Sequence, residues 1–376
     1  MRFPEFSGEW EKCKVSELLD FYSTNSLCWE QLEYDTENIS NLHYGLIHVG
    51  LPTMVNLVQD RLPNIKDGNK PKNYELCKEG DVAFADASED TNEVAKAIEF
   101  YNLNGRDVIC GLHTIHGRDN KDRTVVGFKG YAFSSTAFHN QIRRIAQGTK
   151  IYSISTKNFS ECYIGIPSKV EQAKIASLLH LIDERIVTQN KIIEKLESLI
   201  KGIAHRVAGM GKPNVRIAEC LECTSSTLQE SEVSDLGTYP VYGANGIVGF
   251  LDSYNTPDKA IYIVKDGSGV GPVAYVKGKC SATGTLNILT AKQDYSLQFL
   301  YYLLKVFNFE PYKTGMAIPH IYFKDYGKAK IFCSSYSKQL RYAKMLEAID
   351  AKLLIEQKIL ISLNSQKQYL LRQMFI

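Results

Sequence analysis

Apolar residues recur at heptad spacing in two segments of the chain, and each segment predicts a long helix. Residues 172–198 and 339–365 match one another without a gap at a constant offset of 167. An a/d pattern sustained over five heptads is typical of a coiled coil. Two helices of ~40 residues would each be roughly 60 Å long. The a and d positions are Leu179, Ile186, Ile193, Ile200, Val207, Ile175, Ile182, Gln189, Leu196 and Ile203, then Leu346, Leu353, Leu360, Lys367, Met374, Tyr342, Ile349, Glu356, Leu363 and Leu370.

The repeat is longer than the predicted helices. A register that runs unbroken from loop into helix indicates a duplication rather than chance similarity between two helices. The identical pairs include Gly148 and Gly315, Ile151 and Ile318, Ile164 and Ile331, Gln172 and Gln339, Ala176 and Ala343, and Asp183 and Asp350.

Helix signals divide the chain into four expected segments. Ser168 with Glu171 forms a capping box, and Gly209, Gly211 and Pro213 end the first helix. Outside the helices, strand-like runs alternate with turn signals, which indicates mixed α/β domains. We therefore expect an α+β fold in which two long helices form a coiled coil and alternate with two such domains in an internal repeat. The expected segments are a first domain at 1–166, a first helix at 167–209, a second domain at 210–333 and a second helix at 334–376.

Two polar residues interrupt the apolar seam at equivalent positions. Gln189 and Glu356 both occupy d positions near the middle of their helices. If the helices pack antiparallel, the two side chains meet, and we predict that they fix the register. The alternative is one solvated polar residue in each seam.

A further apolar stripe lies at the g positions, where a two-helix coil has no use for it. Either the globular domains or the helices of another protein would cover this stripe, and we favour partner helices. The residues expected to contact a partner helix are Leu178, Ile192, Leu199, Met345 and Ile359.

Composition places the chain among ordinary soluble proteins. Its 376 residues are 44% hydrophobic and 23% charged, and its nine cysteines fit a reduced, cytoplasmic setting. We find no secretory signal and no apolar stretch long enough to span a membrane, so no membrane partner is expected. The formal net charge of +2 argues against binding nucleic acid by bulk charge but does not describe local patches.

No motif in the chain predicts catalysis or a metal site. The glycine-rich 267–271 is followed by Pro272 and a strand-like run, where a phosphate loop requires a helix. Cys220 and Cys223 form a lone CxxC, and His113 and His116 lack the glutamate and the spacing of a zinc protease. We therefore predict a two-site binding protein with neither a catalytic residue nor a metal ligand.

The pattern resembles the specificity subunits of type I restriction–modification enzymes. The start at 2–10 looks like that of many members, and 146–150 leading into 166–183 looks like the family's junction between domain and helix. Residues 313–321 are the counterpart in the second half. The resemblance covers essentially the whole chain, and the repeat makes it more specific than any one motif.

The resemblance implies a non-catalytic subunit with two mixed α/β target recognition domains, held apart by an antiparallel coiled coil of the two long helices and related by a pseudo-two-fold repeat. Each domain would read one half of an asymmetric, bipartite site in double-stranded DNA. Two modification (methyltransferase) subunits would dock on this subunit, and two restriction subunits can join. No cofactor is expected in this chain; S-adenosylmethionine, ATP and Mg would belong to the partner subunits. The alternative is a non-enzymatic coiled-coil scaffold with two protein-binding domains.

Local charge indicates where DNA would be contacted. Residues 1–150 hold 17 basic and 22 acidic residues, but 118–150 alone hold 7 basic and 2 acidic. Clustered Arg and Lys neutralise phosphates, and Arg, Asn and Gln also reach base edges. The candidate DNA-binding residues are Lys121, Arg123, Gln141, Arg143, Arg144 and Lys150 in the first domain, and Tyr242, Asn245, Lys265, Lys279, Lys313 and His320 in the second. For each residue the alternative is a solvated surface charge or a turn residue.

Overall fold

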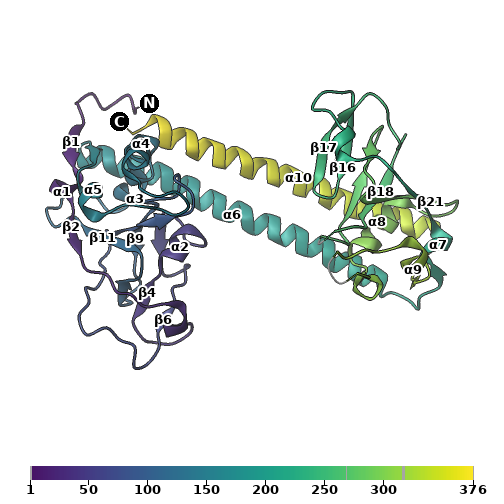
Figure 1. Ribbon diagram of the computed structural model, residues 1–376, viewed down its shortest axis with the longest axis horizontal. Helices are drawn as coiled ribbons and strands as arrows, with labels where there is room; N and C mark the ends of the chain where they lie inside the picture. The colour runs from purple at the N-terminus through teal and green to yellow at the C-terminus, as the bar shows by residue number, and fades with distance from the viewer. Residues whose placement is uncertain (1, 268, 316–317, 376) are drawn as a thin grey trace. The chain divides into compact units, whose positions relative to one another are not determined.

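A computed structural model of the chain describes residues 2–267, 269–315 and 318–375 (Figure 1). Ser268 of the glycine-rich segment, and Met316 and Ala317 of the second junction, lie outside the described residues. The chain divides into two compact units. The units are Met1–Thr188 with Leu360–Ile376, and Gln189–Ile359.

The first unit is built on two sheets. The larger has the order β2-β11-β7-β9-β5, and its central strand β7 is buried on both faces. The smaller has the order β10-β4-β6-β3, in which β10 and β4 are parallel. Their strands are β2 (Asp20–Tyr22), β11 (Thr114–Arg118), β7 (Val82–Ala85), β9 (Ala97–Asn102), β5 (Met54–Asn56), β10 (Val108–Cys110), β4 (Ser40–Leu42), β6 (Asn64–Ile65) and β3 (Leu32–Glu33).

Helices and short strand pairs complete the first unit. Its main core holds Phe84, Phe133 and Phe159 together with Leu179 of one long helix and Leu370 of the other. The remaining elements are β1 (Glu11–Lys14), α1 (Val15–Leu18), η1 (Trp29–Gln31), α2 (Tyr44–His48), β8 (Ala87–Ser88), α3 (Phe128–Phe133), α4 (Thr136–Ile145), β12 (Tyr152–Ser153), α5 (Thr156–Ser160) and β13 (Tyr163–Ile166).

The second unit has a four-stranded sheet, β15-β21-β18-β19, and a three-stranded sheet, β17-β16-β20. Its core gathers Leu289 and Leu300 with Val207 and Ala343 of the long helices. The elements are β14 (Val215–Arg216), α7 (Ile217–Cys220), β15 (Leu221–Ser225), η2 (Glu230–Glu232), β16 (Tyr239–Gly243), β17 (Gly246–Leu251), β18 (Ala260–Val264), β19 (Val273–Val276), β20 (Ser281–Ala282), β21 (Leu286–Ala291), α8 (Leu297–Lys305), η3 (Glu310–Tyr312), α9 (Phe323–Tyr326) and β22 (Lys330–Ile331).

The two long helices of the expected fold are α6 (Lys169–Ala208) and α10 (Tyr336–Gln373). In the first unit the beginning of α6 and the end of α10 share one core. In the second unit Ile200 near the end of α6 packs with Leu346 near the beginning of α10. The helices therefore pair antiparallel, as the resemblance implies, and the coiled coil that the heptad pattern predicts is confirmed. Within the described residues, neither these nor any other helix is long and apolar enough to cross a membrane.

In each unit, the strand near the start of the domain pairs with the strand just before the long helix. β1 pairs antiparallel with β13 in the first unit, and β14 pairs antiparallel with β22 in the second. The first strand of each domain thus lies beside its last strand, which leads into the helix.

Candidate nucleic-acid interface

Three of the predicted cations, at the end of α4 and in the loop that follows it, have no ion-pair partner in the part of the chain that the structure describes. The helix begins at Ser135, whose side chain accepts a hydrogen bond from the backbone N–H of Phe138. Its inner face buries Phe138, so the last turn presents Arg143 and Arg144 to solvent. Among the described residues no side-chain hydrogen bond or ion pair involves Arg143, Arg144 or Lys150 of the following loop.

A half-buried histidine lies close to Arg143 on the same helix. Burial, followed by the nearby Arg143 guanidinium, lowers the pKa of His139 on the same helix. His139 is therefore biased toward the neutral form, and it does not add to the positive charge at this end of α4. The exposed guanidinium groups themselves are the groups available to an external phosphate.

The other three first-domain candidates are engaged within the protein. Lys121 donates from Nζ to the backbone carbonyl of Glu17 at 2.7 Å. Arg123 pairs with Glu11 at 2.6 Å. The amide of Gln141 makes two bonds to the backbone of Tyr163, donating at 2.8 Å and accepting at 2.9 Å. Contacts from these side chains to DNA remain predictions, and each would require an internal bond to open.

In the second unit the fold gathers three of the predicted residues that are far apart in the sequence. The backbone N–H of Ile321 donates to the carbonyl of Lys265, and His320 lies 2.7 Å from Asp266. Lys313 is close to the same loop, because the backbones of Thr314 and His320 are bonded to each other. Lys313 itself pairs with Glu310 at 2.5 Å. The side chain of Lys265 has no ion-pair partner among the described residues.

The hairpin of β16 and β17 carries the remaining candidates. Asn245 lies at its tip and is exposed, next to Gly246 with φ of 113°. Tyr242 was predicted to contact DNA, but it packs against a buried cluster of the second unit, with its ring 5.7 Å from Tyr262. Lys279 lies 4.9 Å from the ring centre of Tyr254, so its charge is held over an aromatic face.

The polar residues of the seam are in contact. Gln189 donates from Nε2 to Glu356, at 2.5 Å to Oε2 and 3.0 Å to the backbone carbonyl. Lys352 donates to the other carboxylate oxygen at 2.8 Å. The bonds from Lys352 and Gln189 lower the pKa of Glu356. The geometry is that of a paired polar contact, while its role in setting the register remains a prediction.

The predicted partner-helix residues differ in exposure. Leu178 is half-buried and packs against the core of its own unit, so a contact with a partner helix remains a prediction for it. Ile192 is half-buried, and Leu199, Met345 and Ile359 are exposed by 48%, 43% and 39%. These three leave apolar surface on the long helices that the chain itself does not cover.

One buried glutamine in each half of the chain bonds a domain to the start of its long helix. The sequence shows these two glutamines only as matching positions of the repeat. Gln172 accepts from the backbone N–H of Val125 at 2.9 Å and donates to the carbonyl of Pro167 at 2.9 Å. Gln339 accepts from the backbone N–H of Ser296 at 2.9 Å and donates to the carbonyl of Ser334 at 2.9 Å. Both glutamines are buried. Because they make equivalent bonds, the two halves of the repeat share the same joint, meaning the contact between a domain and the start of its long helix.

The structure also separates the two histidines that the sequence places together. His113 is exposed and lies 3.1 Å from Asp86. His116 is buried on β11 and lies beside Cys77 and Cys110. The sequence search missed this group because its members are spread over residues 77 to 116 without the close spacing of a metal motif.

Comparison with known proteins shows similarity to type I restriction–modification specificity subunits. The family described as "Type I restriction modification DNA specificity domain" matches residues 61–198 and again 214–365. A protein of Mycoplasma genitalium described as a type I specificity subunit is 26% identical over 272 residues, which is 66% of this chain and 70% of that protein. The specificity subunit of the type I restriction enzyme EcoprrI of Escherichia coli is 24% identical over 112 residues, 30% of this chain and 28% of that protein.

Two solved structures share the fold. The crystal structure of the S subunit of a type I restriction–modification system from M. genitalium matches with a TM-score of 0.65 at 19% identity, covering 100% of this chain and 99% of that one. A structure from work on complex assembly and conformational transition of the type I restriction–modification system matches with a TM-score of 0.58 at 14% identity, covering 98% and 97%. Because the family matches the chain twice and over more than half of its length, the chain belongs to the type I restriction–modification DNA specificity family.

Proposed function

We propose that this chain is the DNA-reading subunit of a type I restriction–modification complex, and that each globular unit reads one half of an asymmetric, bipartite site. The observation that carries the proposal is a duplicated joint that holds two different domains. Gln172 and Gln339 make equivalent bonds, whereas the sheets have five and four strands in one unit and four and three in the other. A common scaffold with divergent domains suits two different ligands of one chemical class.

Exposed cations supply the first part of the contact. Arg143, Arg144 and Lys150 would bind phosphates in one half-site, because their charges have no internal partner to displace. In the second unit, Lys265 and the hairpin-tip Asn245 are the least engaged of the predicted residues. Phosphate contacts of this kind set the position of the protein, and neighbouring amide and guanidinium groups read base edges.

The long helices would dock two modification subunits. The exposed apolar side chains of Leu199, Met345 and Ile359 suit packing against partner helices. The chain would contribute no catalytic group: S-adenosylmethionine would be bound by the modification subunits, and ATP and Mg by two restriction subunits where these join.

The direct test is to co-express the chain with the modification subunit encoded beside it and to map methylated adenines in the host genome. A bipartite motif with one methylated adenine in each half is expected. Replacement of residues 1–166 by those of another family member should change one half of the motif and leave the other. A complex that assembles but methylates no defined sequence would instead favour a coiled-coil scaffold with two protein-binding domains.

The helices would also set the spacer between the two half-sites. One heptad inserted into both helices adds about 10.5 Å of helix, which corresponds to roughly three base pairs of duplex. Methylome sequencing of this variant should show a longer spacer with both half-sites unchanged. An unchanged spacer would contradict this part of the proposal, and insertion into one helix alone serves as the control that disturbs the seam.

A further inference from the structure

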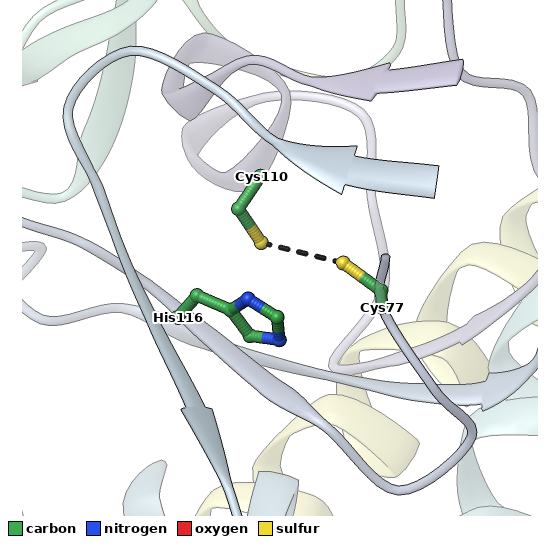
Figure 2. A group of neighbouring side chains, drawn as sticks. All are labelled: Cys77, Cys110 and His116. Carbon is green, nitrogen blue, oxygen red and sulfur yellow. Dashed lines mark hydrogen bonds between the residues drawn. The ribbon is translucent and has the colours of Figure 1, made fainter. Parts of the chain in front are cut away.

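Three metal-ligating side chains converge in the interior of the first unit (Figure 2). Cys110 is the last residue of β10, and the backbone N–H of Cys77 donates to the carbonyl of Val108 on the same strand. His116 comes from β11, and in Figure 2 its ring lies next to the two sulfur atoms. The three side chains thus bring together the four-stranded sheet, which contains β10, and the five-stranded sheet, which contains β11.

The distances suit a single cation. The two sulfur atoms are 3.6 Å apart, and one ligand atom from each of the three residues lies within 4.8 Å of the others. Two thiolates bound to one Zn²⁺ at about 2.3 Å in a tetrahedral arrangement would be separated by about 3.8 Å. The pair therefore already stands close to the spacing that a shared metal imposes.

The imidazole is oriented for coordination. Nε2 of His116 lies 2.7 Å from Oδ2 of Asp81, whereas Nδ1 is buried and has no hydrogen-bond partner among the described residues. An unpartnered buried ring nitrogen is costly, and a metal would satisfy it. A carboxylate on the other ring nitrogen is the usual device that fixes the tautomer and orientation of a metal-binding histidine.

Asp81 is itself held in place, so the orientation of the ring is well determined. Arg118 donates to both oxygens of Asp81, from Nε at 2.9 Å and from Nη2 at 2.8 Å. The backbone N–H of Lys78 donates to the same carboxylate at 2.9 Å. Arg118 also pairs with the partly exposed Glu75 at 2.6 Å, so its guanidinium is shared by two carboxylates and is itself held in place.

The surroundings favour a neutral complex. Cys77 and Cys110 belong to an apolar core and are exposed by only 5% and 2%. A lone thiolate is unfavourable in such a core, but two thiolates, a neutral imidazole and a divalent cation sum to zero charge. Thiolate and imidazole ligands select thiophilic ions of the d¹⁰ class, namely Zn²⁺ and Cu⁺.

We propose that Cys77, Cys110 and His116 bind one thiophilic d¹⁰ cation, which joins the two sheets of the first unit. Zn²⁺ would take a water molecule as its fourth ligand and give a neutral complex. Cu⁺ would be complete with the three protein ligands in a trigonal arrangement but would leave one negative charge, so the neutrality of the core favours Zn²⁺. The site is structural and lies apart from the exposed cations of α4. It therefore stands or falls independently of the proposed function.

The test starts with the wild-type full-length chain, purified under reducing conditions and stripped of metal with a chelator. Zn²⁺ or Cu⁺ is then added in separate samples, and bound metal is measured by mass spectrometry. About one equivalent of at least one ion is expected, with a rise of several degrees in the temperature at which the protein unfolds. Co²⁺ in place of Zn²⁺ should give the intense thiolate-to-metal absorption of a cysteine-bound site.

Variants locate the ligands. Cys77→Ser, Cys110→Ser and His116→Asn should each lower metal affinity at least tenfold. The matched control is Cys220→Ser with Cys333→Ser, another pair of buried cysteines, which should leave binding unchanged. The proposal is overturned if the stripped wild-type chain binds neither ion in one equivalent, or if the control removes binding as effectively as the site variants. The wild-type titration decides the matter even where a variant does not fold.

Discussion

The hydroxyl of Tyr131 donates a hydrogen bond to Oδ2 of Asp183 at 2.9 Å, and this bond ties α3 to the long helix α6. In the second unit Tyr302 of α8 makes the same bond to Asp350 of α10 at 2.5 Å. Asp350 is the copy of Asp183 at the offset of 167. Two domains with different sheets therefore keep one tyrosine–carboxylate contact at the joint with the helix.

Removing this hydroxyl should destabilise the first unit. Tyr131 is fully buried, and its acceptor is a carboxylate, so Tyr131→Phe should lower the free energy of unfolding by about 1.5–3 kcal/mol. Urea unfolding followed by circular dichroism measures the change. Tyr302→Phe is the matched variant and should have an effect of similar size, whereas a loss below about 0.5 kcal/mol in both would show that the bond does not stabilise the joint.

The same tyrosine predicts a dependence on alkaline pH. Burial, followed by the charge of Asp183, raises the pKa of Tyr131 in the folded protein. An unfolded tyrosine ionises near pH 10, so stability is unaffected below about pH 10 and falls as the pH rises above it. Phenylalanine does not ionise, so Tyr131→Phe lacks the part of the stability loss that comes from Tyr131. Its free energy of unfolding should therefore decline less steeply above about pH 10 than that of the wild type. Equal slopes for the two proteins would contradict the prediction.

Asp183 and Asp350 differ in one partner, which allows a matched comparison. Lys367 of α10 lies 2.6 Å from Asp183, whereas Ile200 occupies the copy of that position and is buried beside Tyr302. Asp183→Asn leaves a largely buried ammonium without its partner and should cost about 2–4 kcal/mol. Asp350→Asn should cost about 1–2 kcal/mol, because only a hydrogen bond is weakened.

A second substitution tests this explanation. If Lys367 causes the additional loss, Lys367→Ile should restore most of the stability of Asp183→Asn, because isoleucine already occupies the equivalent position in the other unit. Chemical unfolding of the single and double variants gives the coupling directly. A double variant no more stable than Asp183→Asn would show that Lys367 is not responsible.

The Gln189–Glu356 contact should set the register at the expense of stability. Replacing both residues by leucine makes the middle of the seam apolar and should raise the unfolding temperature by about 2–4 °C. The same change should permit alternative pairings of the helices, which crosslinking of cysteines placed along the seam would detect. A single crosslinked register in the double variant would show that the polar pair is dispensable for register.

The free cations of α4 should account for part of the DNA affinity. Arg143→Ala with Arg144→Ala should weaken binding of the assembled complex to all sequences and lower the slope of log affinity against log salt by about 2. Lys121→Ala is the matched control and should change the slope little, since its ammonium is bonded to the carbonyl of Glu17. An equal change in the control would mean that the internal bond opens on DNA.

The long helices and their pairing could be predicted from the sequence because heptad spacing is a local property. The antiparallel direction came from the family resemblance, and with that direction the equivalent positions of Gln189 and Glu356 predict that the two side chains meet, as they do. The state of the charged side chains could not be predicted in this way. Arg123 is neutralised by Glu11, which lies more than a hundred residues away, and only the folded sheet brings the two together.

The same limit explains the buried cysteine and histidine group. Cys77 and Cys110 are separated by 33 residues, and they meet because Cys77 pairs along β10. Periodicity in the sequence assigns such residues to a strand or a loop, but it does not say which strands are neighbours. Tyr242 shows the same limit, since its position near a hairpin tip does not reveal that its ring packs against a buried cluster.

The repeated joint has a genetic consequence. Each domain is held to its helix by the same glutamine and the same tyrosine–carboxylate bond, and its first and last strands pair before the helix begins. A recombination event with crossovers in the two segments that flank a domain would therefore exchange the whole domain. The new domain would still find the glutamine and the carboxylate on the helix to which it binds. The architecture allows new specificities to arise by shuffling of halves, without stepwise mutation of a working interface.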